Sequence, residues 1–205
     1  ELDLPLQVDL FKDSDVEAIL PKVVELIEEP DPVKASIGVP FYWVAQKAAE
    51  ANFKVMLAGQ GADELFGGYQ RYVTEFCKDG SEAVRKTIYS DVVRIHESNL
   101  ERDLKITGFH NVELRMPFAS FDLVEFALGL PVELKIESKV DTLRKLVLRK
   151  MALNAGMPTS MAQKPKKAVQ YSTGINDAIK RIAKTHEKTV NEYIDELFQQ
   201  SRNNI

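Results

Sequence analysis

The chain has 205 residues, of which 44% are hydrophobic and 28% are charged, and its formal net charge is −4 at pH 7. This composition is typical of a globular protein and excludes a disordered or fibrous one. One cysteine and three histidines exclude a disulfide framework and a zinc site of the usual ligand count. The charge balance does not favour a nucleic-acid partner. Because no apolar run approaches a membrane span and no secretory signal opens the chain, we expect no membrane association and a cytoplasmic location.

The amino-terminal quarter of the chain predicts one strand and two helical regions. Alternating apolar residues over 4–10 indicate a strand. Apolar residues then recur at helical spacing over 16–27, where Pro21 is expected to kink the helix or to split it in two. A buried helix is expected over 41–51, after Pro40.

The run FKVMLA at residues 53–58 is typical of a short strand covered on both faces. The residues after this run show helical patterns. The expected helices are 69–78 ending at Gly80, 81–95 capped by Ser81, 121–128 capped by Ser120, 141–153 ending at Gly156, and one long amphipathic helix over 175–197 before a frayed tail. Two strands do not make a complete sheet, so we expect the other strands to lie in sequence outside these residues.

The stretch richest in chemistry is AGQGADELFGGY, at residues 58–69. The strand leads into Gly59 and Gly61, which permit positive φ angles and close backbone approach. Backbone N–H groups at the start of the next helix favour an anion. Asp63 is placed to face a phosphate through Mg²⁺, which prefers carboxylate and phosphate oxygens. The alternative is a tight turn in which Asp63 and Glu64 only complement the helix dipole.

The residues GQGADELFGGYQRY resemble the signature of the synthetase domain of asparagine synthetases and β-lactam synthetases, which usually reads S-G-E-G-(A/S)-D-E-(L/V)-F-G-G-Y. Two later blocks agree with this family. LERD at 100–103 with VELRMPF at 112–118 resembles its R-D … E-x-R-x-P-F-L-D block. Lys139 with Leu143-Arg144, followed by residues 163–174, resembles its K-x-x-L-R and lysine-rich terminal block.

The resemblance extends over residues 6–174 and implies both a fold and a chemistry. The implied fold class is α/β, the helix-rich carboxy-terminal part of a PP-loop ATP-pyrophosphatase domain of the adenine nucleotide α-hydrolase-like kind. Residues 1–200 would form this synthetase domain and residues 201–205 a tail. The implied reaction uses ATP and Mg²⁺ to convert a carboxylate into an acyl-adenylate with release of pyrophosphate, after which an amine attacks. The resemblance thus implies a ligase of asparagine biosynthesis that amidates aspartate or a similar carboxylate with ammonia or glutamine-derived nitrogen.

By matched position, the resemblance implies that Asp63 binds magnesium and pyrophosphate, with Gly59 and Gly61 in the nucleotide-binding turn. Gln60 stands where asparagine synthetases have glutamate and β-lactam synthetases have tyrosine. Glutamine can form hydrogen bonds but cannot accept a proton at neutral pH. Gln60 is therefore a candidate catalytic position that leaves two reactions open: amidation of aspartate, and ligation of another carboxylate and amine.

The resemblance also implies two kinds of catalytic residue later in the chain. Glu113 matches a carboxylate that helps orient a base in the lactam-forming relatives, and its alternative is an ion pair with Arg115 or Arg102. One lysine of the terminal block should neutralise pyrophosphate and the tetrahedral intermediate. Alignment does not separate Lys166 from Lys167 for this role.

Two parts of the family pattern are not found in these residues. One is the nucleotide loop S-G-G-x-D-S, which supplies backbone N–H groups and a second carboxylate to pyrophosphate. The other is the amino-terminal glutaminase with its cysteine nucleophile, since Cys77 lies on a helix pattern and is interpreted as a core residue. We therefore expect the chain to be the carboxy-terminal part of a longer synthetase, with a non-catalytic remnant as a third hypothesis. A separate glutaminase and a second copy of the chain stay open as partners.

Overall fold

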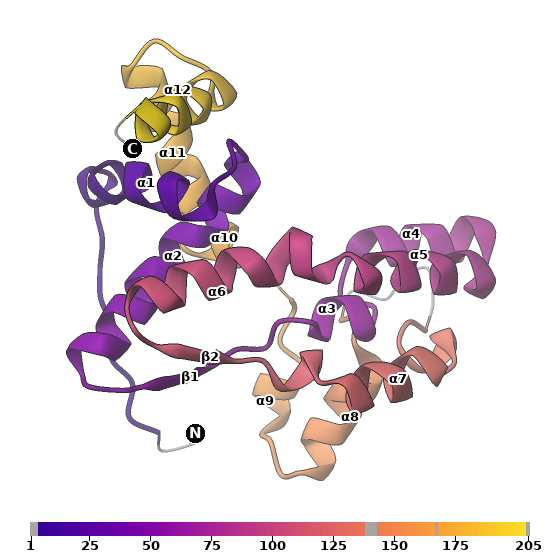
Figure 1. The fold of residues 1–205 in the computed structure, drawn as a ribbon. Helices are drawn as coiled ribbons and strands as arrows, with labels where there is room; N and C mark the ends of the chain where they lie inside the picture. The colour runs from indigo at the N-terminus through magenta and orange to yellow at the C-terminus, as the bar shows by residue number, and fades with distance from the viewer. Residues whose placement is uncertain (1–3, 138–142, 167, 204–205) are drawn as a thin grey trace. The chain divides into compact units, whose positions relative to one another are not determined.

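The computed structural model describes residues 4–137, 143–166 and 168–203 (Figure 1). It is helix-rich, with 69% of residues helical and one small parallel sheet, which is compatible with an α/β fold. Contacts group the chain into two compact units. Unit 1 contains the described residues within 57–96 and 116–166, and unit 2 contains those within 4–56, 97–115 and 168–203. In the described part of the chain, no helix combines the length and the apolar character needed to cross a bilayer.

Unit 2 is built around a single apolar core. Its helices are α1 (Asp13–Ile27), α2 (Pro32–Glu50), α6 (Glu101–Phe109), α10 (Val169–Ser172), α11 (Ile175–Thr185) and α12 (Val190–Asn203), with the π-helical turn η1 (His96–Leu100) before α6. Helices α1 and α2 form the centre of this unit, since α1 contacts α2, α6, α11 and α12, and α2 also contacts α6, α10, α11 and α12. The single long helix expected over 175–197 is two helices, and α12 continues to Asn203, into the segment expected to fray.

Helix α1 continues through Pro21, so the alternative of two short helices is wrong. A proline inside a helix costs about 3 kcal/mol. Three residues of the apolar stripe, Leu20, Val23 and Ile27, are almost completely buried. Each such side chain contributes about 1.5–3 kcal/mol by leaving water, so the stripe outweighs the proline.

Helix α2 begins at Pro32, nine residues before the expected start. The Asp31 carboxylate accepts hydrogen bonds from the backbone N–H groups of Val33 (2.7 Å) and Lys34 (2.9 Å), and Pro32 occupies the first helical position. Pro40 lies inside this helix rather than before it. The expectation that the helix starts after Pro40 is therefore wrong, because a strong amino-terminal cap overrides a single interior proline.

The sheet of the described residues consists of β1 (Val55–Leu57) and β2 (Glu113–Arg115). The strand predicted within 53–58 is confirmed, whereas β2 was not foreseen. The strand predicted over 4–10 is wrong, since these residues have no regular secondary structure. A strand needs a neighbour for its backbone groups. Leu57 is 71% exposed, so the expected cover on both faces of the 53–58 strand is also wrong in this structure.

Unit 1 consists of short helices joined by tight turns. Its elements are α3 (Ala62–Leu65), α4 (Gln70–Asp79), α5 (Ser81–Val93), η2 (Pro117–Ala119), α7 (Phe121–Gly129), η3 (Val132–Leu134), α8 (Leu146–Asn154) and α9 (Thr159–Ala162). Helices α4 and α5 pack side by side after a reversal at Gly80, whose φ is +82°. This confirms two expected helices and their boundary, but the expected cap by Ser81 is wrong, because Gly80 is at the cap position and Ser81 is the first residue of α5. The helix expected over 141–153 is found from Leu146, and residues 141–142 lie outside the described residues.

Unit 1 also buries a lysine beside its apolar core. The side chain of Lys135 is 2% exposed, and its ammonium group donates a hydrogen bond to the carbonyl of Ala127 (2.7 Å) near the end of α7. Burial penalises the charged form and lowers the pKa of Lys135 to about 8. Between this value and the ordinary lysine pKa of 10.5, the unfolded chain binds the proton and the folded chain does not.

This difference predicts how the stability of the protein changes with pH. Since the unfolded state binds more protons in this window, the free energy of unfolding should rise from about pH 8 to 10.5 relative to a Lys135→Met variant. A pKa shift of this size corresponds to a change of about 3 kcal/mol in the free energy of unfolding. Urea unfolding of both proteins at pH 7.5 and at pH 10 measures it, and the comparison cancels the tyrosines that titrate there. Parallel pH profiles would contradict the prediction.

Candidate functional site

The turn that follows β1 is shaped by glycines. Gly61 directly precedes α3 with φ +93°, in the left-handed region, and a Cβ atom there would lie 3.2 Å from the backbone oxygen of Phe118. Gly67 has φ +72°, and a Cβ atom there would lie 2.8 Å from the side chain of Ile136. Gly59 differs, because no atom lies within 4 Å of the position of its Cβ. The conformation therefore requires glycine at 61 and 67, and leaves open space at 59.

Asp63 is the residue around which the site is organised. Its side chain is 26% exposed, and two ammonium groups flank it: Lys145 Nζ lies 2.8 Å from Oδ1 and Lys166 Nζ lies 3.4 Å from Oδ2. Both lysine side chains are mostly buried, at 21% and 19% exposure. Partial burial strengthens the attraction between these charges compared with a surface pair. The sequence-predicted residues Asp63 and Lys166 are thus brought together, with one net positive charge in the trio.

Gly68 is what allows Lys145 to reach Asp63. A Cβ atom at position 68 would lie 1.8 Å from Asp63 Oδ1 and 2.6 Å from Lys145 Cε. Real Cβ atoms do not approach other atoms this closely. Arg144 also touches this turn, since its Nη1 donates to the carbonyl of Gly68 at 3.1 Å. The second glycine of the GG pair therefore provides space for the ion pair rather than an unusual φ angle.

The other carboxylate of the signature faces a tyrosine. Glu64 is buried, and the hydroxyl of Tyr69 donates to its Oε1 at 2.6 Å. Burial and the neighbouring Glu64 both raise the pKa of Tyr69, so the phenol stays protonated. The ammonium of Lys166 lies 5.2 Å from the centre of the Tyr69 ring. Tyr69 therefore connects Glu64 to Lys166.

The positive charge at this turn comes from side chains and not from a helix. Helix α3 is only four residues long, so few dipoles add along its axis. The expectation that the amino terminus of a helix attracts the anion stays a prediction, and Lys145 and Lys166 provide positive charge beside it. The alternative in which Asp63 only complements a helix dipole loses support for the same reason.

The remaining predicted residues are found in different surroundings. Gln60 is partly buried between Gly59 and Gly61. Lys167 lies outside the described residues. Glu113 lies on β2 in unit 2 and pairs with Arg115, with 2.8 Å between Oε1 and Nε, which was one of its two alternatives. This hydrogen bond lowers the pKa of the exposed Glu113.

Lys145 was missed by the sequence reasoning, although the sequence contained a signal for it. The pattern K-x-x-L-R was matched to Lys139 with Leu143-Arg144, where three residues separate the lysine from the leucine. Lys145, Leu148 and Arg149 satisfy the two-residue spacing without adjustment. Lys139 itself lies outside the described residues.

The described residues offer one carboxylate to a metal ion at this site. They contain no group of three or more histidine, cysteine, aspartate or glutamate side chains placed to bind one. Within the described part of the chain, Asp63 Oδ1 is buried and accepts no hydrogen bond of normal angle, although Lys145 neutralises it. Mg²⁺ is commonly held by one or two carboxylates together with substrate phosphates and water. Asp63 therefore fits a magnesium ion that arrives with a phosphate ligand.

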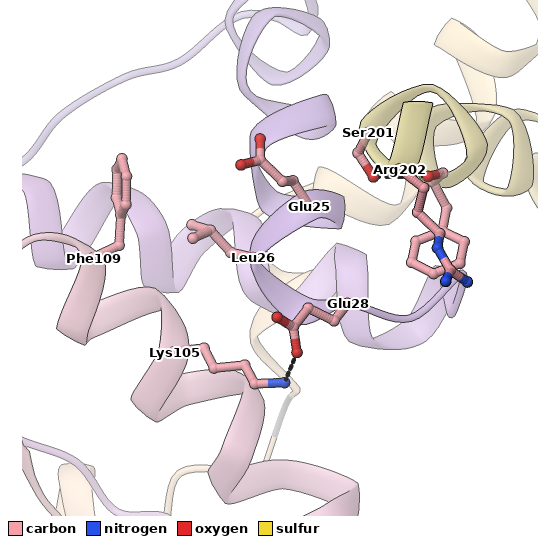
Figure 2. Close-up of a pocket in the computed structure, with 8 residues that line it drawn as sticks. Glu25, Leu26, Glu28, Lys105, Phe109, Ser201 and Arg202 are labelled. Carbon is pink, nitrogen blue, oxygen red and sulfur yellow. Dashed lines mark hydrogen bonds and ion pairs between the residues drawn. The ribbon is translucent and has the colours of Figure 1, made fainter. Parts of the chain in front are cut away.

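A hollow of about 630 Å³ lies in unit 2 among α1, α6 and α12 (Figure 2). Its charged residues include Glu25, Glu28, Lys105 and Arg202. The ammonium of Lys105 is already paired with Glu28 (2.7 Å) and with Glu101 (2.8 Å). This hollow contains none of the predicted site residues, and its lysine charge is neutralised within the unit.

Comparisons with known proteins identify the family of this chain. The family model described as asparagine synthase matches residues 6–79 and 76–204. The chain belongs to the asparagine synthase family. "Putative asparagine synthetase (glutamine-hydrolyzing) 1" of Methanocaldococcus jannaschii is 34% identical over 96% of this chain and 42% of that protein. The human asparagine synthetase domain-containing protein 1 is 37% identical over 63% of this chain and 20% of that protein. The chain spans less than half the length of these relatives.

The packing at position 68 gives a direct test of this candidate site. Changing Gly68 to alanine should push Asp63 away from Lys145 and weaken the binding of magnesium pyrophosphate by roughly tenfold or more, about 1.4 kcal/mol. Gly129→Ala is the matched control, because a Cβ atom there meets nothing within 4 Å and its φ is not positive. Isothermal titration of both variants measures the effect, and equal affinities would contradict the assignment of the site.

Proposed function

We propose that this chain holds the pyrophosphate end of ATP in an asparagine synthetase-type ligase that amidates a carboxylate. The supporting observation is the trio of Asp63, Lys145 and Lys166 on a glycine-shaped turn. The two ammonium groups, on side chains that are mostly buried, provide the positive charge that a diphosphate needs. Family membership supports the reaction type, since this family couples ATP to amide formation.

In the proposed reaction, a substrate carboxylate oxygen attacks the α-phosphorus of ATP, and the bond to the β-phosphate oxygen breaks. The products are an acyl-adenylate and pyrophosphate. Lys145 and Lys166 stabilise the negative charge that builds on the leaving pyrophosphate, in a site whose charges are already oriented. Ammonia then attacks the acyl carbon, AMP leaves with the bonding electrons, and the nitrogen loses a proton to give the amide. Lys166 is also proposed to neutralise the tetrahedral intermediate of this second step.

Magnesium bound with the nucleotide would neutralise phosphate charge, and Asp63 is the residue that would hold it. The two lysines would then turn from the carboxylate toward the phosphate oxygens. This exchange would cost little electrostatic energy, because each ammonium group would leave one anion and pair with another. The nitrogen is proposed to come as ammonia, from glutamine hydrolysis at another site or from solution. Glu113 stays a candidate for orienting a base, with Arg115 as the partner it would have to leave.

A second candidate reaction is ligation of another carboxylate with another amine. Gln60 is the observation that favours it, because this side chain cannot replace a glutamate as a base at neutral pH. Both candidates release pyrophosphate from ATP and use the same trio. They differ only in the acyl substrate and the amine.

The proposed role of Asp63 predicts that Asp63→Asn raises the affinity for pyrophosphate without magnesium and lowers it with magnesium. In Asp63→Asn, the two ammonium groups lose their intramolecular anion. Without Mg²⁺, the variant should bind pyrophosphate at least roughly threefold more tightly, because no carboxylate at position 63 competes with pyrophosphate for the two ammonium groups. With Mg²⁺, it should bind roughly tenfold more weakly, because the metal ligand is gone. Isothermal titration with EDTA and with Mg²⁺ measures both arms, and the same sign in both arms would contradict the role.

The substrate prediction is tested by release of pyrophosphate from ATP with a panel of carboxylates and amines. We expect aspartate with ammonium to give turnover above background, and Lys166→Ala to lower kcat by roughly a hundredfold or more. Lys150→Ala, an exposed lysine on α8, is the control and should leave the rate unchanged. If Gln60→Glu leaves the aspartate rate unchanged, the second candidate loses its support. Absence of both ATP binding and turnover would favour the non-catalytic remnant instead.

A further inference from the structure

Arg149, on the first turn of α8, connects two separate segments of unit 1. Its Nε donates to the carbonyl of Arg144 at 2.6 Å, and its Nη2 donates to the carbonyl of Leu143. Its Nη1 donates to the carbonyls of Ala162 (2.5 Å) and Lys164 (2.9 Å). The planar guanidinium, with donors pointing in fixed directions, therefore joins the turn before α8 to the loop after α9.

Each of these two segments carries one of the lysines that flank Asp63. Lys145 follows directly after Leu143 and Arg144, and Lys166 lies two residues after Lys164. Arg149 bonds the backbone carbonyls of both segments. Asp63 pairs with the ammonium groups at the ends of both lysine side chains. The distance between the two ammonium groups is thus constrained from both sides.

The turn before α8 needs such a constraint. Arg144 and Lys145 have φ angles of +54° and +55°, two consecutive residues other than glycine in the left-handed region. This conformation is uncommon for such residues and persists where the surroundings fix it. The bond from Arg149 to the carbonyl of Arg144 lies at the peptide between them, where it stabilises this backbone.

We propose that Arg149 is a positioning residue that sets the spacing of Lys145 and Lys166 for a diphosphate ligand. This inference rests on the proposed function, because it assumes that the two lysines bind the pyrophosphate of ATP. Arg149 acts through backbone carbonyls and touches neither the ligand nor the reacting atoms. A lysine at position 149 keeps the charge but cannot join both segments, because it has one donor nitrogen in place of three.

A double-mutant cycle separates this role from a merely structural one. The proteins are the parent chain, Arg149→Lys, Lys145→Ala and the double variant, and the probe is inorganic pyrophosphate with Mg²⁺ in isothermal titration. In the parent, Arg149→Lys should weaken binding by roughly tenfold. In the Lys145→Ala background, the same change should cost less than about threefold, since one of its two targets is already gone. Arg85→Lys is the matched control, on an exposed arginine of α5, and should leave affinity unchanged.

Each other outcome has a defined meaning. Equal losses in both backgrounds would overturn the positioning role, because independent structural effects add. If the parent binds pyrophosphate and Arg149→Lys binds it equally well, the inference about Arg149 fails and the proposed function stands. If the parent does not bind pyrophosphate, the proposed function fails and the inference fails with it.

A second variant covers the case in which Arg149→Lys does not fold. Arg149→Gln keeps a neutral amide donor that reaches one segment, and circular dichroism at 10 °C shows whether it is folded. It should also lower affinity while leaving KM for the acyl substrate within about twofold, since the two lysines are proposed to bind pyrophosphate and the tetrahedral intermediate rather than the unreacted carboxylate. Global unfolding of both variants would overturn the proposal, because Arg149 would then serve the fold as a whole.

Discussion

The ion pairs of Asp63 with Lys145 and Lys166 are the interaction on which the described site depends. They need a chain that reverses within a few residues and two backbones that approach closely. Gly61 provides the left-handed φ angle, and Gly68 leaves the space that any side chain would fill. Packing around the Asp63 carboxylate therefore explains Gly68, whereas Gly61 and Gly67 are explained by their positive φ angles and by the close approach of Phe118 and Ile136.

This arrangement suits a ligand that carries more charge than the carboxylate it replaces. In water, two unit charges 4 Å apart interact by about 1 kcal/mol, and partial burial makes the interaction several times stronger. The two lysine side chains are mostly buried, and the single carboxylate of Asp63 offsets only one of their two charges. A diphosphate, with its metal ion on Asp63, would offer both lysines a stronger partner. The site is thus preorganised by the same charges that would bind its ligand.

Several features of the fold could be predicted because local physics decides them. The cap of Gly80 set the boundary between α4 and α5, and the FKVMLA run set β1. The failures have physical causes as well. Pro40 lies within α2 because Asp31 caps the helix far upstream. Residues 4–10 alternate like a strand, yet alternation describes two faces and supplies no neighbour to pair with.

The sequence alone indicated the family and offered Asp63 and a choice between two lysines as candidate site residues, because these follow an ordered run of residue types. It also placed Glu113 beside Arg115, though not which of its two alternatives holds. Only the tertiary structure decided that Lys145 meets Asp63 and that Arg149 joins the segments carrying Lys145 and Lys166. The reason is that these contacts join residues about 80 to 100 positions apart, or across a helix and a loop. Such contacts depend on how the helices of unit 1 pack, which no local pattern of residues specifies.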